Sequence, residues 1–299
     1  MITRNLKSLL KYPILLLIFF SSILTHAQPI PEQNISRHTA EDRHPVISKK
    51  DIVIFESNRS GKWAIYRMNS NGENIHCLIC DEFNNRTPSL AFKDNILLFE
   101  SDRSGMFQLY EFNIKNHSIK KALSVDYIQQ FGSYSPNGKY LSFSSRNADD
   151  PESWVIWIYD RKKNKLHSPD YLGKRSLYPA WSPDSKKITF FSRKNTDGLT
   201  DELYVYELSA TSTTRLTQNT VNDFSPTYGP KGKYIYFVKS LDYQTKPEIY
   251  KISVKTGLES RLTFNNESDT EPDISSNGKY MVWTGVRNSN YEILITTLK

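Results

Sequence analysis

The sequence predicts an all-β protein folded as a closed, six-bladed β-propeller. Three observations support this prediction: a unit that recurs along the chain, the two-residue period of its apolar positions, and the way the two ends of the repeat region complement each other. The recurring unit opens with a proline or glycine, and the six openings are Pro45, Pro88, Gly132, Pro179, Pro226 and Pro272. Their spacings run from 43 to 47 residues, a period typical of propellers and solenoids.

Each unit predicts four antiparallel strands. In the fifth unit we expect strands at 226–228, 234–238, 248–254 and 260–263, with turns at Lys231-Gly232 and Thr256-Gly257. Apolar and polar residues alternate there, Val, Ile, Tyr, Phe and Thr are frequent, and Gly, Pro and Asn bound the segments. After residue 27, no apolar residues recur at helical spacing for three turns, so we expect only strands.

The two ends of the repeat region predict how the ring closes. The sixth unit supplies strands at 273–275, 280–284 and 291–297 but no fourth strand. Residues 35–39 (Ile-Ser-Arg-His-Thr) are similar to 260–263 (Ser-Arg-Leu-Thr), the fourth strand of the fifth unit. We therefore expect the segment 28–44 to complete the last blade of a propeller that spans 45–299. Such closure hides strand edges that a solenoid would expose.

Residues 1–27 have the pattern of a secretory signal peptide. Three cations (Arg4, Lys7, Lys11) precede the apolar run 14–20 and then Thr25-His26-Ala27. The run is shorter than the ~20 residues of a membrane-spanning helix, so cleavage after Ala27 is favoured over an uncleaved anchor. We expect a periplasmic or secreted protein with no stable membrane insertion after cleavage.

The charge pattern argues against nucleic-acid binding. Removal of the three signal cations lowers the formal net charge from +7 to +4. The remaining cations are scattered through every unit, whereas a nucleic-acid interface concentrates them on one face.

The repeat itself resembles a known family. Tyr-Ser-Pro-Asn-Gly-Lys at 134–139 and Trp-Ser-Pro-Asp-Ser-Lys at 181–186, with the later Ile-Tyr, Thr-Gly and Arg-Leu-Thr segments, are similar to the WD40-like (PD40) repeat of the TolB propeller family over residues 35–299. The resemblance implies a propeller but no single function, because related propellers serve the Tol-Pal system, gate prolyl oligopeptidase-like enzymes and form oligogalacturonate lyases. TolB carries an α/β domain before its propeller, and residues 28–44 leave no room for one, so we expect the propeller domain alone.

Two sets of polar residues recur near one mouth of the predicted channel. Three residues before each opening, on the expected loop between blades, stand Asp42, Asn85, Gln129, Ser176, Asp223 and Asp269; near the end of each second strand stand Arg59, Arg103, Arg146, Arg193, Lys239 and Arg287. These residues could bind a ligand at the mouth, or they could fasten their own loops.

Residues that depart from the repeat are the better binding candidates, because no rule of blade construction requires them. The candidate binding residues are His44, Tyr127, Phe131, Arg175 and Tyr178, together with Asp223 and Asp269. A loop aromatic can equally cover a blade edge.

Metal and thiol chemistry have weaker signals. Insertions at 147–154 and 195–202 carry acidic residues that could hold Ca²⁺, namely Asp149, Asp150, Glu152, Asp197, Asp201 and Glu202. Neither insertion matches an EF-hand loop, so we expect no metal or other cofactor. Cys77 and Cys80 form either a local disulfide or two free thiols. In a straight strand their Cα atoms would lie ~10 Å apart, so a disulfide requires the chain to turn between them.

The motif inventory favours binding over catalysis. No Gly-x-Ser-x-Gly elbow occurs, and the histidines at 38, 44, 76, 117 and 167 fall at unrelated blade positions. We expect an exported, monomeric, non-enzymatic protein that binds an envelope protein or peptide at the channel mouth. The alternative is a carbohydrate-binding or lyase-like propeller enzyme.

Overall fold

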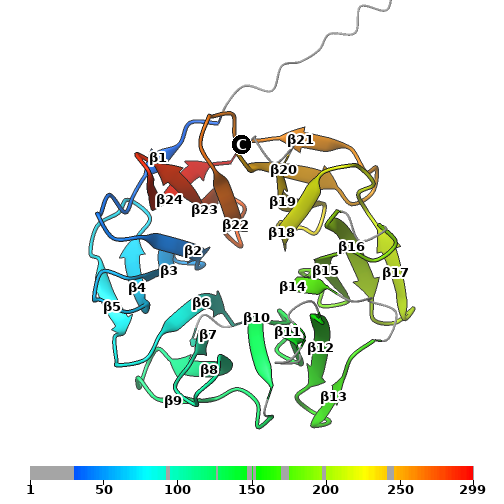
Figure 1. The fold of residues 1–299 in the computed structure, drawn as a ribbon, viewed down its shortest axis with the longest axis horizontal. Coiled ribbons are helices and arrows are strands. Elements are labelled where there is room, and N and C mark those ends of the chain that lie inside the picture. The colour runs from blue at the N-terminus through cyan, green and yellow to red at the C-terminus, as the bar shows by residue number, and fades with distance from the viewer. Residues whose placement is uncertain are drawn as a thin grey trace, which may run out of the picture.

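The computed structural model describes residues 30–91, 95–125, 127–146, 150, 153–169, 175–196, 200–240 and 246–298. They form six four-stranded antiparallel sheets arranged as a ring around a central channel (Figure 1), which confirms the predicted six-bladed propeller. The predicted signal peptide lies outside the described residues. No helix among the described residues is both long and apolar enough to cross a bilayer.

The first three blades each follow the chain from the channel outward. Blade 1 contains β2 (Asp42–Ile47), β3 (Ile52–Ser57), β4 (Ala64–Asn69) and β5 (His76–Ile79). Blade 2 contains β6 (Asn85–Leu90), β7 (Ile96–Ser101), β8 (Gln108–Asn113) and β9 (Ile119–Lys121). Blade 3 contains β10 (Ile128–Tyr134), β11 (Tyr140–Arg146), β12 (Val155–Asp160) and β13 (Lys165–His167).

The last three blades complete the ring. Blade 4 contains β14 (Ser176–Trp181), β15 (Lys187–Ser192), β16 (Glu202–Glu207) and β17 (Ser212–Arg215). Blade 5 contains β18 (Asn222–Tyr228), β19 (Tyr234–Ser240), β20 (Glu248–Ser253) and β21 (Glu259–Arg261). Blade 6 contains β22 (Asp269–Ile274), β23 (Tyr280–Arg287), β24 (Asn290–Thr297) and, from the other end of the chain, β1 (Gln33–Asn34).

The N-terminal segment closes the ring, although its strand lies earlier than 35–39. Gln33 pairs with Ile295 and Asn34 with Leu294 in an antiparallel ladder. The Ile35 amide still donates to the Ile293 carbonyl at 2.9 Å, but the Ile293 amide donates to the side-chain Oγ of Ser36. A side chain therefore replaces the backbone as acceptor, and the ladder ends before the predicted strand does.

Buried aromatic rings hold the blades together. The centre of each second strand carries a ring with no exposed surface, and the six are Phe55, Phe99, Phe143, Phe190, Phe237 and Trp283. The two-residue period places each ring on one face of its sheet, where it packs into the layer shared with a neighbouring blade. Each such burial stabilises the fold by ~1.5–3 kcal/mol.

Every inner strand is interrupted by a bulge at the residue before the opening proline or glycine. Register shifts occur there in all six blades. The bulge residues all have positive φ between 48° and 56°: His44, Thr87, Phe131, Tyr178, Ser225 and Glu271. A bulged residue leaves the ladder, so its side chain need not follow the alternation between the two faces of the sheet. The six bulge side chains lie at one level of the channel.

The inner strands begin earlier than the sequence predicted. Asp223 and Asp269 were expected on loops between blades, but both lie within inner strands, where Asp223 pairs with Lys239 and Asp269 with Gly285. Each of these inner strands already pairs with the second strand before the bulge. The short motif after the proline gives no sign of that earlier pairing.

Cys77 and Cys80 form a disulfide with a Cα–Cα separation of 6.1 Å. The ladder between β4 and β5 shifts register next to Ile65 and Tyr66, which shortens the ~10 Å separation that a straight strand would impose. The outer edge of blade 1 is therefore covalently fastened.

Candidate functional site

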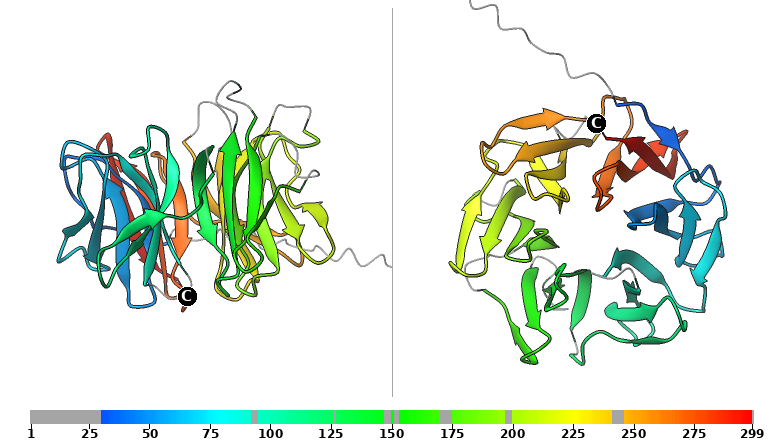
Figure 2. Two further views of the ribbon diagram at one scale, coloured as in Figure 1. Left: turned by 90° about the horizontal axis from the view of Figure 1, so that it is seen from below. Right: turned by 180° about the vertical axis from the view of Figure 1, so that it is seen from behind.

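Five of the six bulge residues line a small, open cavity in the channel. Its volume is about 120 Å³, and its lining includes His44, Thr87, Tyr178, Ser225 and Glu271 with the prolines that follow four of them. The side view in Figure 2 shows that the ring has two ends. We call the end at which the inner strands begin the entry end, and the opposite end the far end.

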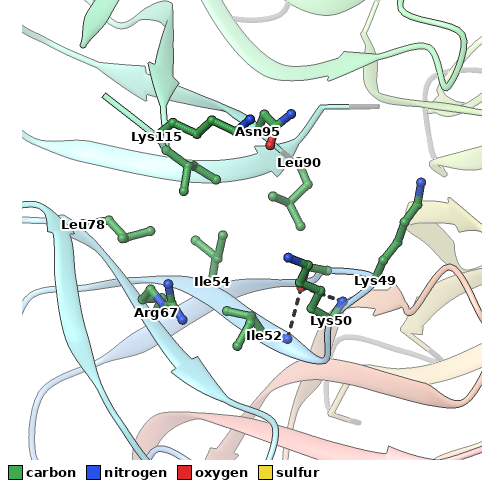
Figure 3. Close-up of a pocket in the computed structure, with 11 residues that line it drawn as sticks. Lys49, Lys50, Ile52, Ile54, Arg67, Leu78, Leu90, Asn95 and Lys115 are labelled. Atoms are coloured by element: carbon green, nitrogen blue, oxygen red, sulfur yellow. Dashed lines mark hydrogen bonds between the residues drawn. The ribbon is translucent and has the colours of Figure 1, made fainter. Parts of the chain in front are cut away.

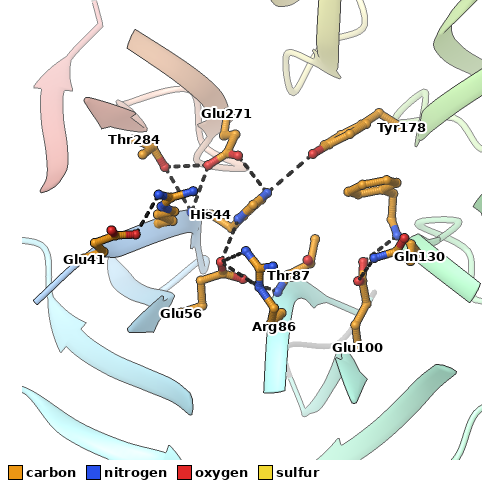
Figure 4. Close-up of polar contacts among 12 residues, drawn as sticks. Glu41, His44, Glu56, Arg86, Thr87, Glu100, Gln130, Tyr178, Glu271 and Thr284 are labelled. Carbon is orange, nitrogen blue, oxygen red and sulfur yellow. Dashed lines mark hydrogen bonds and ion pairs between the residues drawn. The ribbon is translucent and has the colours of Figure 1, made fainter. Parts of the chain in front are cut away.

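His44 lies between two carboxylates at the centre of this site (Figure 4). Its Nδ1 lies 3.2 Å from Oε1 of Glu56, and its Nε2 lies 2.8 Å from Oε1 of Glu271. The exposed fractions of the three side chains are 14% for His44, 0% for Glu56 and 19% for Glu271. Such burial is tolerated only when opposite charges face each other closely.

The mutual attraction outweighs burial in setting the ionisation of this group. Burial alone would lower the pKa of His44, yet Glu271 and Glu56 raise it to about 10. Burial would raise the pKa of Glu56, but His44 and Arg86 lower it to about 2. Glu271 also has a lowered pKa because of His44. At neutral pH the site therefore holds an imidazolium between two carboxylates.

Second-strand side chains accept hydrogen bonds from the bulge amides of the next blade. Glu56 Oε2 accepts from the Thr87 amide at 2.6 Å, and Glu100 Oε1 accepts from the Phe131 amide at 2.7 Å. Thr284 Oγ1 accepts from the His44 amide at 3.0 Å. The acidic half of the channel wall comprises Glu56, Glu100, Thr284, His44, Glu271 and Arg86.

Glu56 and Glu100 differ in their neighbours. Glu56 also accepts from the Arg86 guanidinium at 2.9 Å. Among the described residues, Glu100 accepts only from Gln130 Nε2 at 2.9 Å in addition to the Phe131 amide. Burial consequently raises the pKa of Glu100.

The opposite part of the wall is aromatic. Phe131 and Tyr178 stack with ring centres 3.8 Å apart, Tyr178 lies 5.7 Å from Phe191, and Phe191 meets Phe224 edge-on at 6.4 Å. Trp154 flanks Phe131 at 6.3 Å. These five residues form the aromatic half. Phe191 occupies the second-strand position that Glu56 and Glu100 occupy in blades 1 and 2.

Tyr178 connects the two halves. Its hydroxyl lies 3.5 Å from His44 Nε2, across the channel from a residue 134 positions earlier. Burial and the three nearby carboxylates raise the pKa of this phenol well above its usual value, so it stays protonated. Three of the predicted site residues, His44, Phe131 and Tyr178, are thus brought together.

The other predicted site residues lie elsewhere. Asp223 and Asp269 have no exposed surface. Lys239 Nζ lies 3.7 Å from Asp223, and Arg287 lies 3.0 Å from Asp269; Arg59 holds Asp42 at 2.8 Å in the same way. In these three blades the recurrent polar pair therefore fastens its own blade, as the alternative interpretation proposed.

Arg175 and Tyr127 lie on the entry-end loops rather than in the cavity lining. Arg175 Nε lies 3.2 Å from Asp201, which Arg193 also contacts at 3.1 Å. Tyr127 is 43% exposed and stacks on Trp157 at 6.0 Å.

The sequence reasoning missed the carboxylates Glu56, Glu100 and Glu271. Glu56 and Glu100 each follow four apolar residues in a strand and precede a serine, so an acid within a buried strand was the available signal. Glu271 stands in the slot before the opening proline, where His44 and Tyr178 had already been singled out.

Within the part of the chain that the structure describes, no group of three or more His, Cys, Asp or Glu side chains could hold a metal ion. Of the acidic insertions, Asp201 and Glu202 pair with arginines. Asp149, Glu152 and Asp197 lie outside the described residues.

The fold and its repeat match a family model. Residues 171–299 match the model described as PD40, the TolB beta propeller domain. A protein described as a TolB homolog from Chlorobium chlorochromatii (strain CaD3) is 25% identical over 188 residues, which are 63% of this chain and 31% of that protein. Residues 171–299 are thus similar to the TolB beta propeller domain, and the chain is similar in sequence to a TolB homolog.

A second similar protein is described as a peptidase. A Bacillus subtilis (strain 168) protein described as the uncharacterized peptidase YuxL is 28% identical over 131 residues, which are 41% of this chain and 20% of that protein. The chain thus matches less than a third of the length of either relative.

Two solved structures share the fold alone. TolB from Acinetobacter baumannii superposes with a TM-score of 0.65 at 16% identity, covering 90% of this chain and 65% of that chain. An oligogalacturonate lyase in complex with manganese superposes with a TM-score of 0.60 at 10% identity, covering 91% and 97%.

Proposed function

We propose that this chain is a binding protein that receives a segment of a partner protein at the entry end of its channel. The observation that carries the proposal is the cavity at the bulges, with His44 and Glu271 on one side and the Tyr178 ring on the other. Aromatic, methionine and arginine side chains are enriched where proteins meet. A peptide offers backbone amides to the carboxylates and apolar side chains to the rings.

The rim of the entry end supports a protein partner. Met106, Tyr127 and Phe264 are large apolar residues with exposed fractions of 40%, 43% and 38%. They lie in the connections after β7, before β10 and before β22, and strand direction places all three connections at the entry end. A partner that covers them would bury apolar surface around a polar centre, as interfaces commonly do.

The location of this partner follows from the sequence. The signal-like segment 1–27 and the TolB relationship support export, so we infer that the partner is an envelope protein or peptide and that the chain works in the periplasm or outside the cell.

A carbohydrate ligand is the second candidate. Stacked Phe131 and Tyr178 beside Glu100 and Glu271 offer ring faces next to carboxylates, a combination that sugars also use. Proton abstraction by His44 is disfavoured, because both of its ring nitrogens lie on carboxylates and its raised pKa keeps it protonated at neutral pH.

The test is affinity capture from an envelope extract with three forms of the purified protein. Ser225→Tyr places a ring in the cavity at a bulge where Tyr178 shows that a tyrosine is tolerated. Leu258→Ser is the matched control, because Leu258 is 73% exposed in the β20–β21 hairpin at the far end. We expect one protein to be retained by the wild type and by Leu258→Ser and lost with Ser225→Tyr.

Overlapping peptides of the captured protein, titrated by calorimetry, then locate the bound segment. Retention by all three forms would contradict the entry-end site. Binding of a purified oligosaccharide, lost with Ser225→Tyr, would establish the carbohydrate alternative instead.

A further inference from the structure

A second hollow lies at the far end, in the interface between blades 1 and 2. Its volume is about 730 Å³, within the range of pockets that hold small molecules. Figure 3 shows Ile52, Ile54, Leu78 and Leu90 facing one another across it. Ile114 also belongs to this aliphatic lining. We call this hollow the aliphatic groove.

The aliphatic groove occurs where an aromatic ring is absent. At each blade interface, the first residue of a second strand lies near the last residue of the next inner strand. Five of these pairs contain at least one ring: Ile96 with Tyr134, Tyr140 with Trp181, Lys187 with Tyr228, Tyr234 with Ile274, and Tyr280 with Ile47. The pair between blades 1 and 2 is Ile52 with Leu90, and two aliphatic side chains leave unfilled the space that a ring occupies elsewhere.

One wall of the aliphatic groove carries a partly buried cation, Arg67. Arg67 pairs with Ile54 across the ladder, its buried Nε has no hydrogen-bond partner, and its guanidinium makes no ion pair with any described residue. Glu111 holds the corresponding place in blade 2, where Lys120 lies 3.1 Å away. A buried donor nitrogen without a hydrogen-bond partner is costly, so an acceptor atom of a ligand would be stabilised beside it.

The charged residues described along the lining of the aliphatic groove are all cations. Lys49, Lys50 and Lys115 join Arg67 among its lining residues, and the described lining contains no carboxylate. Cations around an apolar cleft attract an anion and raise its local concentration.

We propose that the aliphatic groove binds a single-chain amphiphilic anion, an alkyl carboxylate of the fatty-acid class. The aliphatic walls receive the tail, and the Arg67 guanidinium accepts the carboxylate in the two-pronged geometry that arginine favours. This site is separate from the channel, so it stands or fails independently of the proposed partner binding.

The test is calorimetric titration of the purified protein with laurate below its micellar concentration. Arg67→Gln should weaken laurate binding at least tenfold, because it removes a charge-assisted contact. Ile52→Tyr restores the ring present at the other interfaces and should abolish binding while leaving the melting temperature equal or higher. Lys251→Gln is the matched control, since Lys251 holds the same ladder position in blade 5 and should leave laurate binding unchanged.

Dodecanol, which has the same tail without the charge, separates the two parts of the proposal and should bind at least tenfold more weakly than laurate. Equal affinity for dodecanol and laurate, or an Arg67→Gln affinity equal to wild type, would overturn the anionic ligand class. Laurate binding that survives Ile52→Tyr would overturn the site.

Discussion

The acidic and aromatic halves of the channel wall share one backbone device and differ in what stabilises it. Both present bulge residues with positive φ at the same level. In the acidic half, Glu56 and Glu100 satisfy the bulge amides of the next blade. In the aromatic half, Phe191 takes the corresponding place, and stacking replaces hydrogen bonding.

The acidic and aromatic halves differ in how strongly the loss of one side chain destabilises them. Burial of an unpaired carboxylate costs several kcal/mol, so Glu56 depends on His44 and Arg86 together. An aromatic pair contributes only ~0.5–1.5 kcal/mol beyond its burial. The acidic half is therefore the more sensitive to one substitution, and its stability depends on pH.

The largest expected effect is that of His44→Ala, which leaves Glu56 and Glu271 without their shared cation. We expect the free energy of unfolding to fall by ~3–5 kcal/mol, as for other broken buried pairs, measured by urea denaturation at pH 6. Ser225→Ala, at the corresponding bulge of blade 5, should change it by less than ~0.5 kcal/mol. Equal losses in the two variants would refute the comparison.

The pH dependence of the free energy of unfolding tests the same difference between the two halves. His44 has a pKa raised to about 10, so its contribution is complete below pH ~6.5 and is lost as pH rises through about 10. Glu56 has a pKa lowered to about 2, so its contribution is complete above pH ~4.5 and is lost as pH falls toward 2. The stability difference between wild type and His44→Ala should peak between these limits and shrink by ~3 kcal/mol or more by pH 10.

Comparison of Glu56→Gln with Glu100→Gln separates the contribution of the ion pairs to stability from that of the hydrogen bonds to the bulge amides. Each carboxylate accepts from the bulge amide of the next blade, but only Glu56 also contacts His44 and Arg86. We expect denaturation at pH 7 to give losses of ~3 kcal/mol for Glu56→Gln and ~1 kcal/mol for Glu100→Gln. A larger loss for Glu100→Gln would show that the amide contacts dominate.

Phe131→Ala tests the aromatic half. It removes the stack on Tyr178 and the contact with Trp154, and because Phe131 is only partly buried we expect a loss of ~2 kcal/mol, below that of a fully buried ring. The loss should be the same at pH 6 and pH 9, in contrast to His44→Ala. A loss that varies with pH would show that the two halves are electrostatically coupled.

The smallest expected effect is that of Tyr178→Phe. The contact of its hydroxyl with His44 Nε2 is long, at 3.5 Å, so its removal should change the free energy of unfolding by less than ~0.5 kcal/mol. A loss above ~1 kcal/mol would make this hydroxyl a structural link between the halves.

Much of the fold could be predicted because local sequence patterns determine it. The repeated Pro-aromatic openings, the turn residues and the two-residue period each depend on a few neighbouring residues. The closing role of the N-terminal segment was also recognisable, although its strand lies at Gln33–Asn34 because the Ser36 side chain ends the ladder.

The site was only partly predictable for the same reason. His44, Phe131 and Tyr178 stood out by departing from the repeat, but Asp223 and Asp269 had the same polarity whether they bound a ligand or fastened a blade. The ion pairs of Asp223 with Lys239 and of Asp269 with Arg287 indicate that the two carboxylates fasten their own blades.

The sequence by itself determined the blades, because strand period, turn chemistry and repeat length are local properties. Only the tertiary structure decided that Glu271 of the last blade and Glu56 of the first hold His44 between them, and that Tyr178 of the fourth blade reaches it. Ring closure sets those contacts, since it brings to one channel residues up to 240 positions apart in the chain. Charge and burial then fix their ionisation, and no local pattern encodes that.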